Sequence, residues 1–510
     1  MKIRTSLHFA HFKPGGFGRR KKRGNYMEYV IKGREPADAL RYFEEICAIP
    51  HGSKNEKALA EYIKKFAEDR GLWVKMDDMY NLIIKKPGSK GCEDLPPIIL
   101  QGHLDMVCEK NQDVVHDFEK DPLKLKIRDG NILYAEGTTL GADDGVAIAY
   151  MMAILDRNDL VHPPLECVMT VQEEIGLLGA LGLDGADLHA KRMIGMDAGG
   201  EGIFLVSSAG GGYVNYEIPF TRVPAQGQAV ALSVRGLIGG HSAGMIDAER
   251  GNSIKILART LYNLSKTCKF TISTISGGAK TNAIPRESDC VILLQQGTLE
   301  DVKASVAESE GKIKAELAFS DPDVSISVSA ASADTMMDET ASKKLLRALH
   351  LAPNGCQMMS KAIPGLVNAS LNVGVVTTHE DKVVIELLIR NAADSLREMI
   401  ADNLLDLADT IGITAYTFKE FPAFDYSAES PLRDLAMSLY EKTSGKKAEI
   451  RAVHGGTECG VFRTLCPGID IIGFGPRKGE AHTLAEWMDL DSYNTTFQFL
   501  IKLLEEITKL

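Results

Sequence analysis

The sequence predicts an α/β protein: an open, mostly parallel-stranded sheet flanked by helices, interrupted by an inserted α+β domain. Three observations predict this fold. Short apolar runs of strand character alternate with helical patterns over the first 200 or so residues and again from about residue 430. Several of these runs lead directly into acidic residues, as strands do at the functional edge of a parallel sheet. From about residue 210 to about 421 the pattern changes to alternating strands interleaved with helices, which indicates a second domain.

Two helices and two strands are expected first. The segment PADALRYFEEICAIPHGSKNEKALAEYIKKFAEDRGL has apolar residues at helical spacing on both sides of its IPHGS break. It therefore predicts two helices, the second ending near Gly71. The segment WVKMDDMYNLIIKK then predicts two short strands around a turn.

The next predicted strand and helix both carry polar residues at one end. The apolar run Ile98–Leu100 reads as a buried strand and leads into His103 and Asp105. Residues two apart on a strand point to the same side, so these two side chains are expected to lie together. The segment GTTLGADDGVAIAYMMAILD places Asp143 and Asp144 at or before the N-terminus of an apolar helix.

Two further strands end in acidic residues. The predicted strand Leu165–Val171 runs into Glu173 and Glu174, which precede a helix. The segment KRMIGMDAGG predicts another strand, ending at Asp197. Because the carboxyl ends of parallel strands meet at one sheet edge, these acids are expected to gather there.

The domain boundaries follow from these changes of pattern. Residues 1–26 are expected to be a basic, disordered extension, and Met27 opens the segment that looks folded. Residues 27–209 and 422–510 are expected to form one discontinuous domain, and residues 210–421 the inserted domain.

Charge and composition exclude several classes of protein. The net charge is −11, and residues 1–24 hold eight Lys or Arg and no acid, so the remainder carries −11 − 8 = −19. A body this acidic argues against nucleic acid as a partner. No apolar run approaches the ~20 residues needed to span a bilayer, so no membrane association is expected. The nine cysteines form no CxxC pair, which favours reduced thiols in the cytoplasm.

The polar residues at the predicted sheet edge require a cation once they are brought together. Carboxylates in close contact repel by about 4 kcal/mol per pair at a surface-like dielectric. Taken singly, each could be a solvated loop residue, and His103 could be a core histidine with a carboxylate partner. The set consists of His103, Asp105, Asp143, Asp144, Glu173, Glu174, Asp197 and His482.

Imidazole nitrogen with carboxylate oxygen and no thiolate is a donor set suited to Zn²⁺, Mn²⁺ or Co²⁺. Two imidazoles and several acids suffice for a pair of ions about 3.5 to 4 Å apart, bridged by a carboxylate and a water. The neighbouring Glu173 and Glu174 point different ways, so one can bind metal while the other carries a proton.

The ordered motifs of residues 27–510 resemble the M20 metallopeptidases, and among them the aminoacyl-histidine dipeptidases (Xaa-His dipeptidase, peptidase D, bacterial carnosinase). The motifs that carry the resemblance are ICAIPHGS, QGHLDMVCEKN, VHDFEKDPL, GTTLGADDGVAIA, TVQEEIGLLGA, GLIGGHSAGMI, TNAIPRE, APNGC, SLNVGVV, GGTECGVF and AHTLAEW. The resemblance implies a zinc-peptidase-like catalytic domain with an inserted lid domain, two divalent ions (zinc, with manganese or cobalt as alternatives), and a homodimer.

The resemblance also implies roles for the residues of the sheet edge. His103 would bind one ion, with the Asp105 carboxylate fixing its ring. Asp143 would bridge both ions, and the peptide bond after it would be cis. Asp144 stands where close relatives carry Asn, which adds a negative charge near the site.

The remaining roles at the sheet edge are implied in the same way. Glu173 would be the general base and acid, and Glu174 a metal ligand. Asp197 would be a ligand on the side of His103, and His482 would complete the ligand set beside Glu174. His51 and His116 are instead expected to hold loops.

The inserted domain and the GGTECG motif supply the substrate residues that the resemblance implies. His241 would polarise the scissile carbonyl, in relatives often from the partner subunit. Asn282 and Arg390 would hold the substrate's C-terminal carboxylate; the alternatives are a turn Asn and a surface ion pair. Gly456, next to Gly455, could approach a ligand with its backbone, and Glu458 could receive the free amine.

The function predicted is dipeptide hydrolysis. An unblocked dipeptide, preferentially Xaa-His, would be attacked by a metal-bridging hydroxide with Glu173 as the base. One alternative is a related M20 tripeptidase or N-acyl-amino-acid deacylase with the same metal ligands. The other is a non-catalytic, metal-dependent binding homologue, although such a protein needs no proton shuttle beside Glu174.

Overall fold

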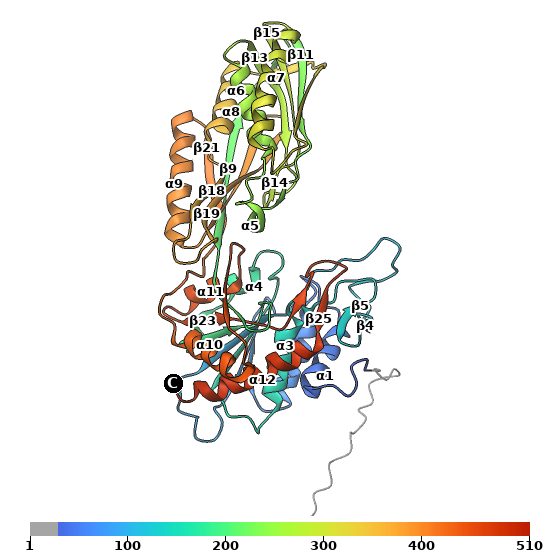
Figure 1. The fold of residues 1–510 in the computed structure, drawn as a ribbon, viewed down its shortest axis with the longest axis vertical. Helices are drawn as coiled ribbons and strands as arrows, with labels where there is room; N and C mark the ends of the chain where they lie inside the picture. Colours follow the sequence, from blue (N-terminus) through green and yellow to red (C-terminus); the bar gives the residue numbers. More distant parts are fainter. Residues whose placement is uncertain (1–28) are drawn as a thin grey trace, which may run out of the picture.

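The computed structural model describes residues 29–510, so the predicted basic extension of residues 1–26 lies outside the described residues. Two bodies are stacked along the long axis of the molecule, each built around its own large sheet (Figure 1). Strands within residues 73–208 and 449–473 form one sheet, and strands within residues 210–421 form the other. This is the predicted α/β fold with an inserted α+β domain. The division at 209/210 and 421/422 stays our proposal for the domain boundaries.

The first sheet has eight strands and is mixed. Four neighbouring pairs are parallel and three are antiparallel; three of the parallel pairs are consecutive in the middle of the sheet, and the fourth lies at one edge. In spatial order its strands are β1 (Trp73–Met76), β2 (Leu82–Lys86), β6 (Leu165–Thr170), β3 (Ile98–His103), β7 (Arg192–Gly195), β23 (Asp470–Gly473), β8 (Ile203–Ser208) and β22 (Glu449–Val453).

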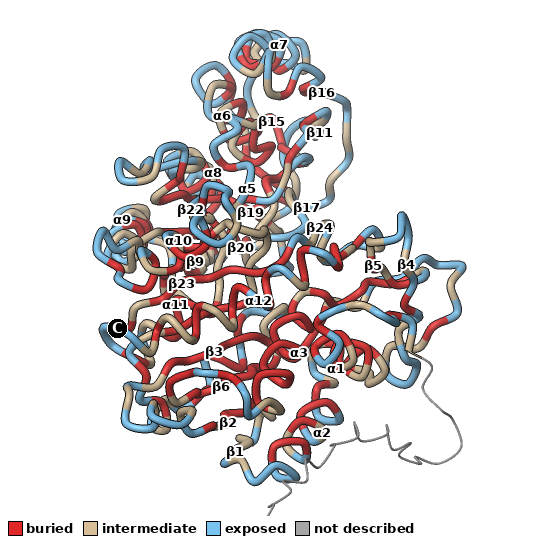
Figure 2. Tube along the Cα trace, turned by 60° about the horizontal axis from the view of Figure 1, so that its bottom comes forward, coloured by how far each residue is buried: buried red, intermediate tan, exposed pale blue. Residues whose placement is uncertain are grey.

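Helices cover both faces of this sheet. Ile98 and Leu100 of β3 belong to the core shared with helices on one face, whereas Ile99 belongs to a second core on the other face. The buried middle of β3, β6 and α3 is visible in Figure 2. The first face carries α1 (Ala37–Cys47), α3 (Ala142–Asp156), α10 (Pro431–Ser444) and α12 (Leu490–Ile507); the second carries α11 (Glu458–Leu465). The helices α2 (Lys57–Glu68) and α4 (Leu178–Gly182) complete this domain.

The register of the central strands aligns their carboxyl ends. In the parallel pairing, His103 of β3 lies opposite Thr170 of β6, and Gln101 lies opposite Gly195 of β7. The chain then continues from β6 into Glu173 and from β7 into Asp197, so the three segments leave the sheet at the same edge. The strand expected to end at Asp197 ends two residues earlier, at Gly195.

The second sheet is antiparallel throughout its main path. Its pairings follow alternating patterns such as Val230, Leu232 and Val234, which are buried while their neighbours are partly exposed. Its strands, in order, are β16 (Ser325–Ala330), β11 (Gln228–Arg235), β15 (Ser288–Gln296), β13 (Lys269–Gly277), β19 (Val367–Thr378), β20 (Lys382–Asn391), β9 (Gly210–Pro219) and β21 (Thr414–Phe421), with β18 (Gly355–Met359) paired to β19.

One apolar core joins this sheet to its helices. The core contains residues of α6 (Ser253–Leu264), α7 (Leu299–Glu316), α8 (Glu339–Leu351) and α9 (Asp394–Ile411). The remaining elements are small: β4 (Leu125–Arg128), β5 (Ile132–Ala135), β24 (Lys478–Gly479) and β25 (Trp487–Asp489) form one sheet, β12 (Gly240–His241) pairs with β14 (Ala283–Ile284), and β10 (Arg222–Pro224) pairs with β17 (Thr335–Met337); α5 is Ser242–Met245, and Gly185–Asp187 is a 3₁₀ turn.

The structure bears on two expectations about the chain, those on membrane-spanning helices and on the cysteines. Within residues 29–510, the helices are all too short or too polar to cross a bilayer. All nine cysteines are free thiols, as the absence of CxxC pairs predicted.

Candidate active site

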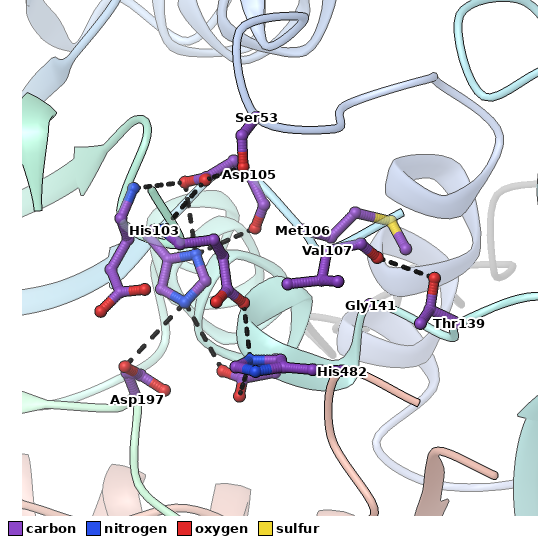
Figure 3. Close-up of polar contacts among 12 residues, drawn as sticks. Ser53, His103, Asp105, Met106, Val107, Thr139, Gly141, Asp197 and His482 are labelled. Atoms are coloured by element: carbon purple, nitrogen blue, oxygen red, sulfur yellow. Dashed lines mark hydrogen bonds and ion pairs between the residues drawn. The ribbon is translucent and has the colours of Figure 1, made fainter. Parts of the chain in front are cut away.

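His103, at the end of β3, lies at the centre of a group of carboxylates. Its ring is 1% exposed, and Nδ1 lies 2.9 Å from the backbone oxygen of Asp105 and 3.5 Å from Oδ1 of the same residue. Its Nε2 lies 3.5 Å from Asp143 Oδ1 and 3.9 Å from Asp197 Oδ2 (Figure 3). Because a carbonyl oxygen can only accept, Nδ1 carries the proton. The lone pair of Nε2 is therefore directed at Asp143 and Asp197, as in a metal-binding histidine.

The buried Asp105 carboxylate forms hydrogen bonds with two other loops, those that contain Ser53 and the Glu173–Glu174 pair. It accepts hydrogen bonds from Ser53 Oγ (2.7 Å), from the backbone N–H of Glu173 (2.9 Å) and from that of Glu174 (3.3 Å). Burial acts to raise its pKa, but the contacts with His103 and Ser53 lower the pKa below its usual value, so the group stays ionised. Asp105 thus orients His103 and also fixes the backbone that carries the two glutamates.

Asp143 is held at the start of α3 by a carboxylate from the far end of the chain. The two oxygens of Glu486 accept hydrogen bonds from the backbone N–H groups of Leu140, Gly141, Ala142 and Asp143, at 2.7 to 3.3 Å. The peptide bond between Asp143 and Asp144 is cis, as the resemblance implied. Asp143 Oδ1 faces His103, and its Oδ2 lies 3.5 Å from His482 Nε2. Each oxygen thus faces a different histidine, which is the arrangement of a bridging ligand.

His482 approaches from a loop between β24 and β25. Its Nε2 lies 2.9 Å from Glu174 Oε1, and its backbone has the left-handed φ of +65°. Non-glycine residues adopt this conformation at a cost, and they are found preferentially at functional sites. Hydrogen bonds with Asp143 and Glu174 raise the pKa of His482 to about 10.

The acids at the sheet edge have too few cationic partners to balance their charge. Burial raises the pKa of Glu173 well above its usual value, with a further contribution from Asp197. Burial and the charge of Asp143 raise the pKa of Asp197 to about 7. The cause is the close packing of anions away from water, which a bound cation relieves.

The donor atoms present fit metal ions. Ligand atoms of His103, Asp144 and Asp197 lie within 4.8 Å of one another, and so do those of Asp143, Glu174 and His482. His103, Glu173 and Glu174 form a third such group. Both carboxylate oxygens of Asp144 are buried without a hydrogen-bond partner in the described structure. Imidazole with carboxylate oxygen is a donor set for zinc, manganese or cobalt.

Three of the predicted substrate residues form a second cluster, on the inserted domain. The guanidinium of Arg390, on β20, donates from Nε to Ser242 Oγ at 3.3 Å, and the backbone N–H of Ser242 donates to Asn282 O at 2.9 Å. His241, next to Ser242, is exposed, and its Nδ1 accepts from Ala243 N at 3.2 Å. Although the residue is exposed, partial desolvation of its ring, then the charge of Arg390, lowers the pKa of His241, so its ring is neutral.

The turn after β22 lies between the two clusters. The backbone oxygen of His454 accepts a hydrogen bond from Arg390 Nη1 at 3.5 Å, and His454 Nε2 lies 2.7 Å from Ser370 Oγ of β19. Gly456 packs so closely on Phe421 that a Cβ there would lie 2.9 Å from the ring. This turn therefore connects the inserted sheet to the edge of the first one.

Glu458 lies at the edge of the first sheet, with the other acids. Its Oε2 accepts hydrogen bonds from Gln101 Nε2 and Thr170 Oγ1, both at 2.6 Å, whereas Oε1 has no partner in the described structure. The side chain is buried, and burial raises its pKa to about 8.

With this geometry established, comparison with known proteins identifies the family. The sequence profile of peptidase family M20/M25/M40 matches residues 99–506. The chain belongs to this family. It is a metallopeptidase with the family's fold, as its motifs implied.

Relatives of this M20 peptidase match along nearly the whole chain. The cytosol non-specific dipeptidase of Escherichia coli (strain K12) is 36% identical over 468 residues, covering 91% of this chain and 96% of the relative. The crystal structure of aminoacylhistidine dipeptidase from Vibrio alginolyticus superposes with a TM-score of 0.85 at 34% identity, covering 93% of this chain and 97% of that one. Aminopeptidase PepT from Bacillus cereus ATCC 10987 has a TM-score of 0.53 at 17% identity, covering 92% and 98%, and shares the fold.

Two buried residues of this M20 peptidase were not foreseen from its sequence. Glu486 cradles the backbone before α3, and its signal was its place in the motif AHTLAEW, four residues after His482. Lys478 places its Nζ 3.0 Å from Asp143 Oδ1, and no motif pointed to it. The charges of Asp143 and Asp197 raise the pKa of this lysine although burial acts to lower it.

Proposed function

We propose that this M20 peptidase is a dinuclear metal-dependent dipeptidase of the cytoplasm that hydrolyses unblocked dipeptides, preferentially Xaa-His. The observation that carries the proposal is the position of Asp143, whose two oxygens face His103 and His482 separately, next to Glu173 and Glu174. This arrangement divides the ligand atoms between two positions that share one carboxylate.

Five residues would hold the two ions. His103 and Asp197 serve one position, Glu174 and His482 the other, and Asp143 serves both. Zinc suits the donor set, and manganese and cobalt are the alternatives. When bound, such a pair of ions supplies Lewis-acid polarisation of the scissile carbonyl and lowers the pKa of a water molecule between them.

Glu173 is the proposed proton carrier. Its backbone N–H is fixed by Asp105, and burial raises the pKa of its carboxyl toward the range in which a group can both accept and return a proton. Glu173 takes the proton of the attacking water and delivers it to the amine of the leaving amino acid. Asp105 assists by holding His103 in the tautomer that presents Nε2.

Arg390 is the proposed anchor of the substrate's C-terminal carboxylate. Its guanidinium is buried and forms no ion pair with a carboxylate in residues 29–510; its polar contacts are the Ser242 hydroxyl and a backbone oxygen. A buried cation without an anion is costly, and a carboxylate accepting two hydrogen bonds from the fork would satisfy it. Asn282 lies beside it through Ser242, and the neutral His241 is the group proposed to polarise the scissile carbonyl.

The amino end of the substrate would lie toward Gly456 and Glu458. The unpartnered Oε1 of Glu458 is the acceptor proposed for the ammonium group, and Gly456 has no side chain to obstruct a ligand. Contacts at both ends of a short peptide would exclude longer or blocked substrates, which supports a dipeptidase.

The proposed substrate preference and location follow the relatives. The Vibrio protein is named an aminoacylhistidine dipeptidase and the Escherichia coli protein a cytosol non-specific dipeptidase. We also infer a homodimer formed through the inserted domain. Exposed apolar side chains on that domain support it, namely Ile238, Met245, Met358 and Met359, each 40–53% exposed.

A substrate panel tests the proposal. The metal-loaded protein is assayed with β-Ala-His, Gly-His, a dipeptide without histidine, a tripeptide and an N-acetyl amino acid. We expect hydrolysis of the free dipeptides, fastest with C-terminal histidine. Faster cleavage of the tripeptide or the N-acetyl amino acid would assign the chain to a neighbouring M20 activity, and no cleavage of any substrate would leave a binding protein.

A further inference from the structure

The two candidate metal positions differ in one neighbour, the side chain of Lys478. This lysine lies on β24, and its side chain is 8% exposed. Its Nζ lies 3.0 Å from Asp143 Oδ1 and 3.6 Å from Asp197 Oδ1. Among the lysines and arginines of residues 29–510, it alone forms ion pairs with the candidate ligands.

The ammonium group lies on one side of the bridging carboxylate. Asp143 Oδ1, which Lys478 contacts, is the oxygen 3.5 Å from His103 Nε2. The other oxygen, Oδ2, lies 3.5 Å from His482, next to Glu174, and no lysine or arginine of the described chain pairs with it. Lys478 therefore shares Asp143 Oδ1 with the His103–Asp197 position. At Asp197 it contacts Oδ1, whereas Oδ2 faces His103, and it pairs with no oxygen of the Glu174–His482 position.

Sharing Asp143 Oδ1 with an ammonium group weakens the binding of a divalent ion. An ion at the His103–Asp197 position needs a lone pair of Asp143 Oδ1, and the ammonium group already donates to that oxygen. The ion and the ammonium group also repel each other at short range, where little water screens them. Asp144 offers a compensating negative charge, but its oxygens make no hydrogen bond to the lysine or to any other group of the described chain.

We propose that Lys478 makes the two metal positions unequal, so that the Glu174–His482 position fills first and tightly and the His103–Asp197 position fills second and weakly. The inference rests on the dinuclear site of the proposed function. It describes a protein that keeps one ion through purification and takes up the second when free metal rises. Lys478 acts through the ligands and is a positioning residue, since it touches neither ion nor substrate in this account.

Titration of the full-length, chelator-stripped protein with Zn²⁺ tests the inference, with binding followed by calorimetry. For the wild type we expect two steps whose dissociation constants differ by at least about tenfold. Lys478→Met keeps the length of the side chain and removes the charge, so its second step should tighten by about tenfold or more while the first changes little. Lys478→Arg keeps the charge and should keep the two steps apart.

The matched control is Arg477→Met. Arg477 is the neighbouring residue, and its guanidinium pairs with Asp489 at 2.7 Å, outside the metal site, so its loss should leave both steps unchanged. If Lys478→Met does not fold, Lys478→Gln retains a hydrogen-bond donor without the charge and is titrated instead.

Two equal steps in the wild type, or a second step that does not tighten when the charge of Lys478 is removed, would overturn the inference. Either result would leave the proposed function standing. Absence of zinc binding and of peptide hydrolysis in the wild type would instead overturn the proposed function itself.

Discussion

The edge of the first sheet and the cluster on the inserted domain have opposite deficits of charge. At the sheet edge, one lysine, Lys478, pairs with two acids, Asp143 and Asp197. The buried or partly buried acids gathered there number seven: Asp105, Asp143, Asp144, Glu173, Glu174, Asp197 and Glu458. On the inserted domain, the buried Arg390 has neutral partners. Unbalanced charge in a protein interior is costly, so each region indicates the ligand that would balance it. The first requires cations, and the second a carboxylate.

The two regions are also built on different kinds of sheet. The first sheet is covered by helices on both faces, so its functional residues gather where parallel strands end. The inserted sheet is antiparallel, and Arg390 projects from within β20, paired with Ser370 of β19 and Gly211 of β9. The candidate metal ligands are therefore positioned by the ends of parallel strands, whereas Arg390, the proposed carboxylate-binding residue, is positioned by its pairing within an antiparallel sheet.

The largest effect is expected from removing the proton carrier while keeping the cations. Glu173→Ala should lower kcat about 1000-fold or more, because general acid–base catalysis contributes about 10²- to 10⁴-fold. Both ions should remain, as measured by elemental analysis of the purified protein. The matched variant Glu174→Ala should lose an ion as well as activity. Loss of metal from Glu173→Ala would make this residue a ligand.

Removing the metal ions with a chelator should lower the free energy of unfolding, because the acids at the sheet edge then lack the cations that neutralise them. At an ion concentration about 1000 times the dissociation constant, one bound ion stabilises a protein by about 4 kcal/mol. In the chelated protein, the pKa of Asp197 is raised to about 7 and that of Glu458 to about 8, chiefly by burial. Acids with a raised folded pKa stabilise the fold at low pH, and this contribution is lost as pH rises through the folded value.

The free energy of unfolding of the chelated protein should therefore fall between about pH 4 and pH 8. The metal-loaded protein should show no such fall, since the ions neutralise the same acids. Denaturant titrations across this range measure both. A parallel pH dependence with and without metal would contradict the charge imbalance.

His454, in the turn between the two regions, should contribute to the free energy of unfolding with the opposite pH dependence. Burial, then the charge of Arg390, lowers the pKa of His454 to about 4. The unfolded chain takes up a proton near pH 6.5, so the stability due to neutral His454 is present above that pH and is lost as pH falls toward 4. The loss should reach at most ~3 kcal/mol and be absent in His454→Gln. An unchanged acid limb in that variant would exclude His454 as its source.

Removing the lone cation should affect substrate binding and leave the metal in place. Arg390→Met should lower kcat/KM for a free dipeptide about 100-fold, since hydrogen bonds between charged groups contribute about 1.5 to 3 kcal/mol. A dipeptide amide, which has no carboxylate, should be cleaved equally by both proteins. Arg397→Met, which removes an ion pair with Glu420 on the same domain, is the control. An equal loss on the amide would mean that Arg390 is structural.

The smallest effect is expected at the contact between His454 and Ser370. Ser370→Ala removes a 2.7 Å hydrogen bond that joins the two regions, at a cost of about 1 kcal/mol in the free energy of unfolding. Urea denaturation measures it, and KM should rise slightly because Arg390 also contacts this turn. A larger change in KM than in stability would show that the contact mainly orients Arg390.

The sequence predicted those parts of the fold and candidate site that depend on local pattern. His103, Asp143, Glu173 and Asp197 follow strands or begin a helix, and strand ends converge by a general rule of parallel sheets. Glu486 and Lys478 were missed because their contacts join residues more than 300 positions apart. Lys478 has no local signal, and the motif AHTLAEW that contains Glu486 does not reveal which backbone its carboxylate binds. The antiparallel pairing of β23 with β8 also depends on the closed fold rather than on either strand.

The measurement that tests the central claim most directly is anomalous diffraction from a crystal soaked in saturating manganese. The account predicts two peaks about 3.5 to 4 Å apart, one on each side of the Asp143 carboxylate, one toward His103 and the other toward His482. A single peak at saturation, or peaks away from Asp143, would contradict it.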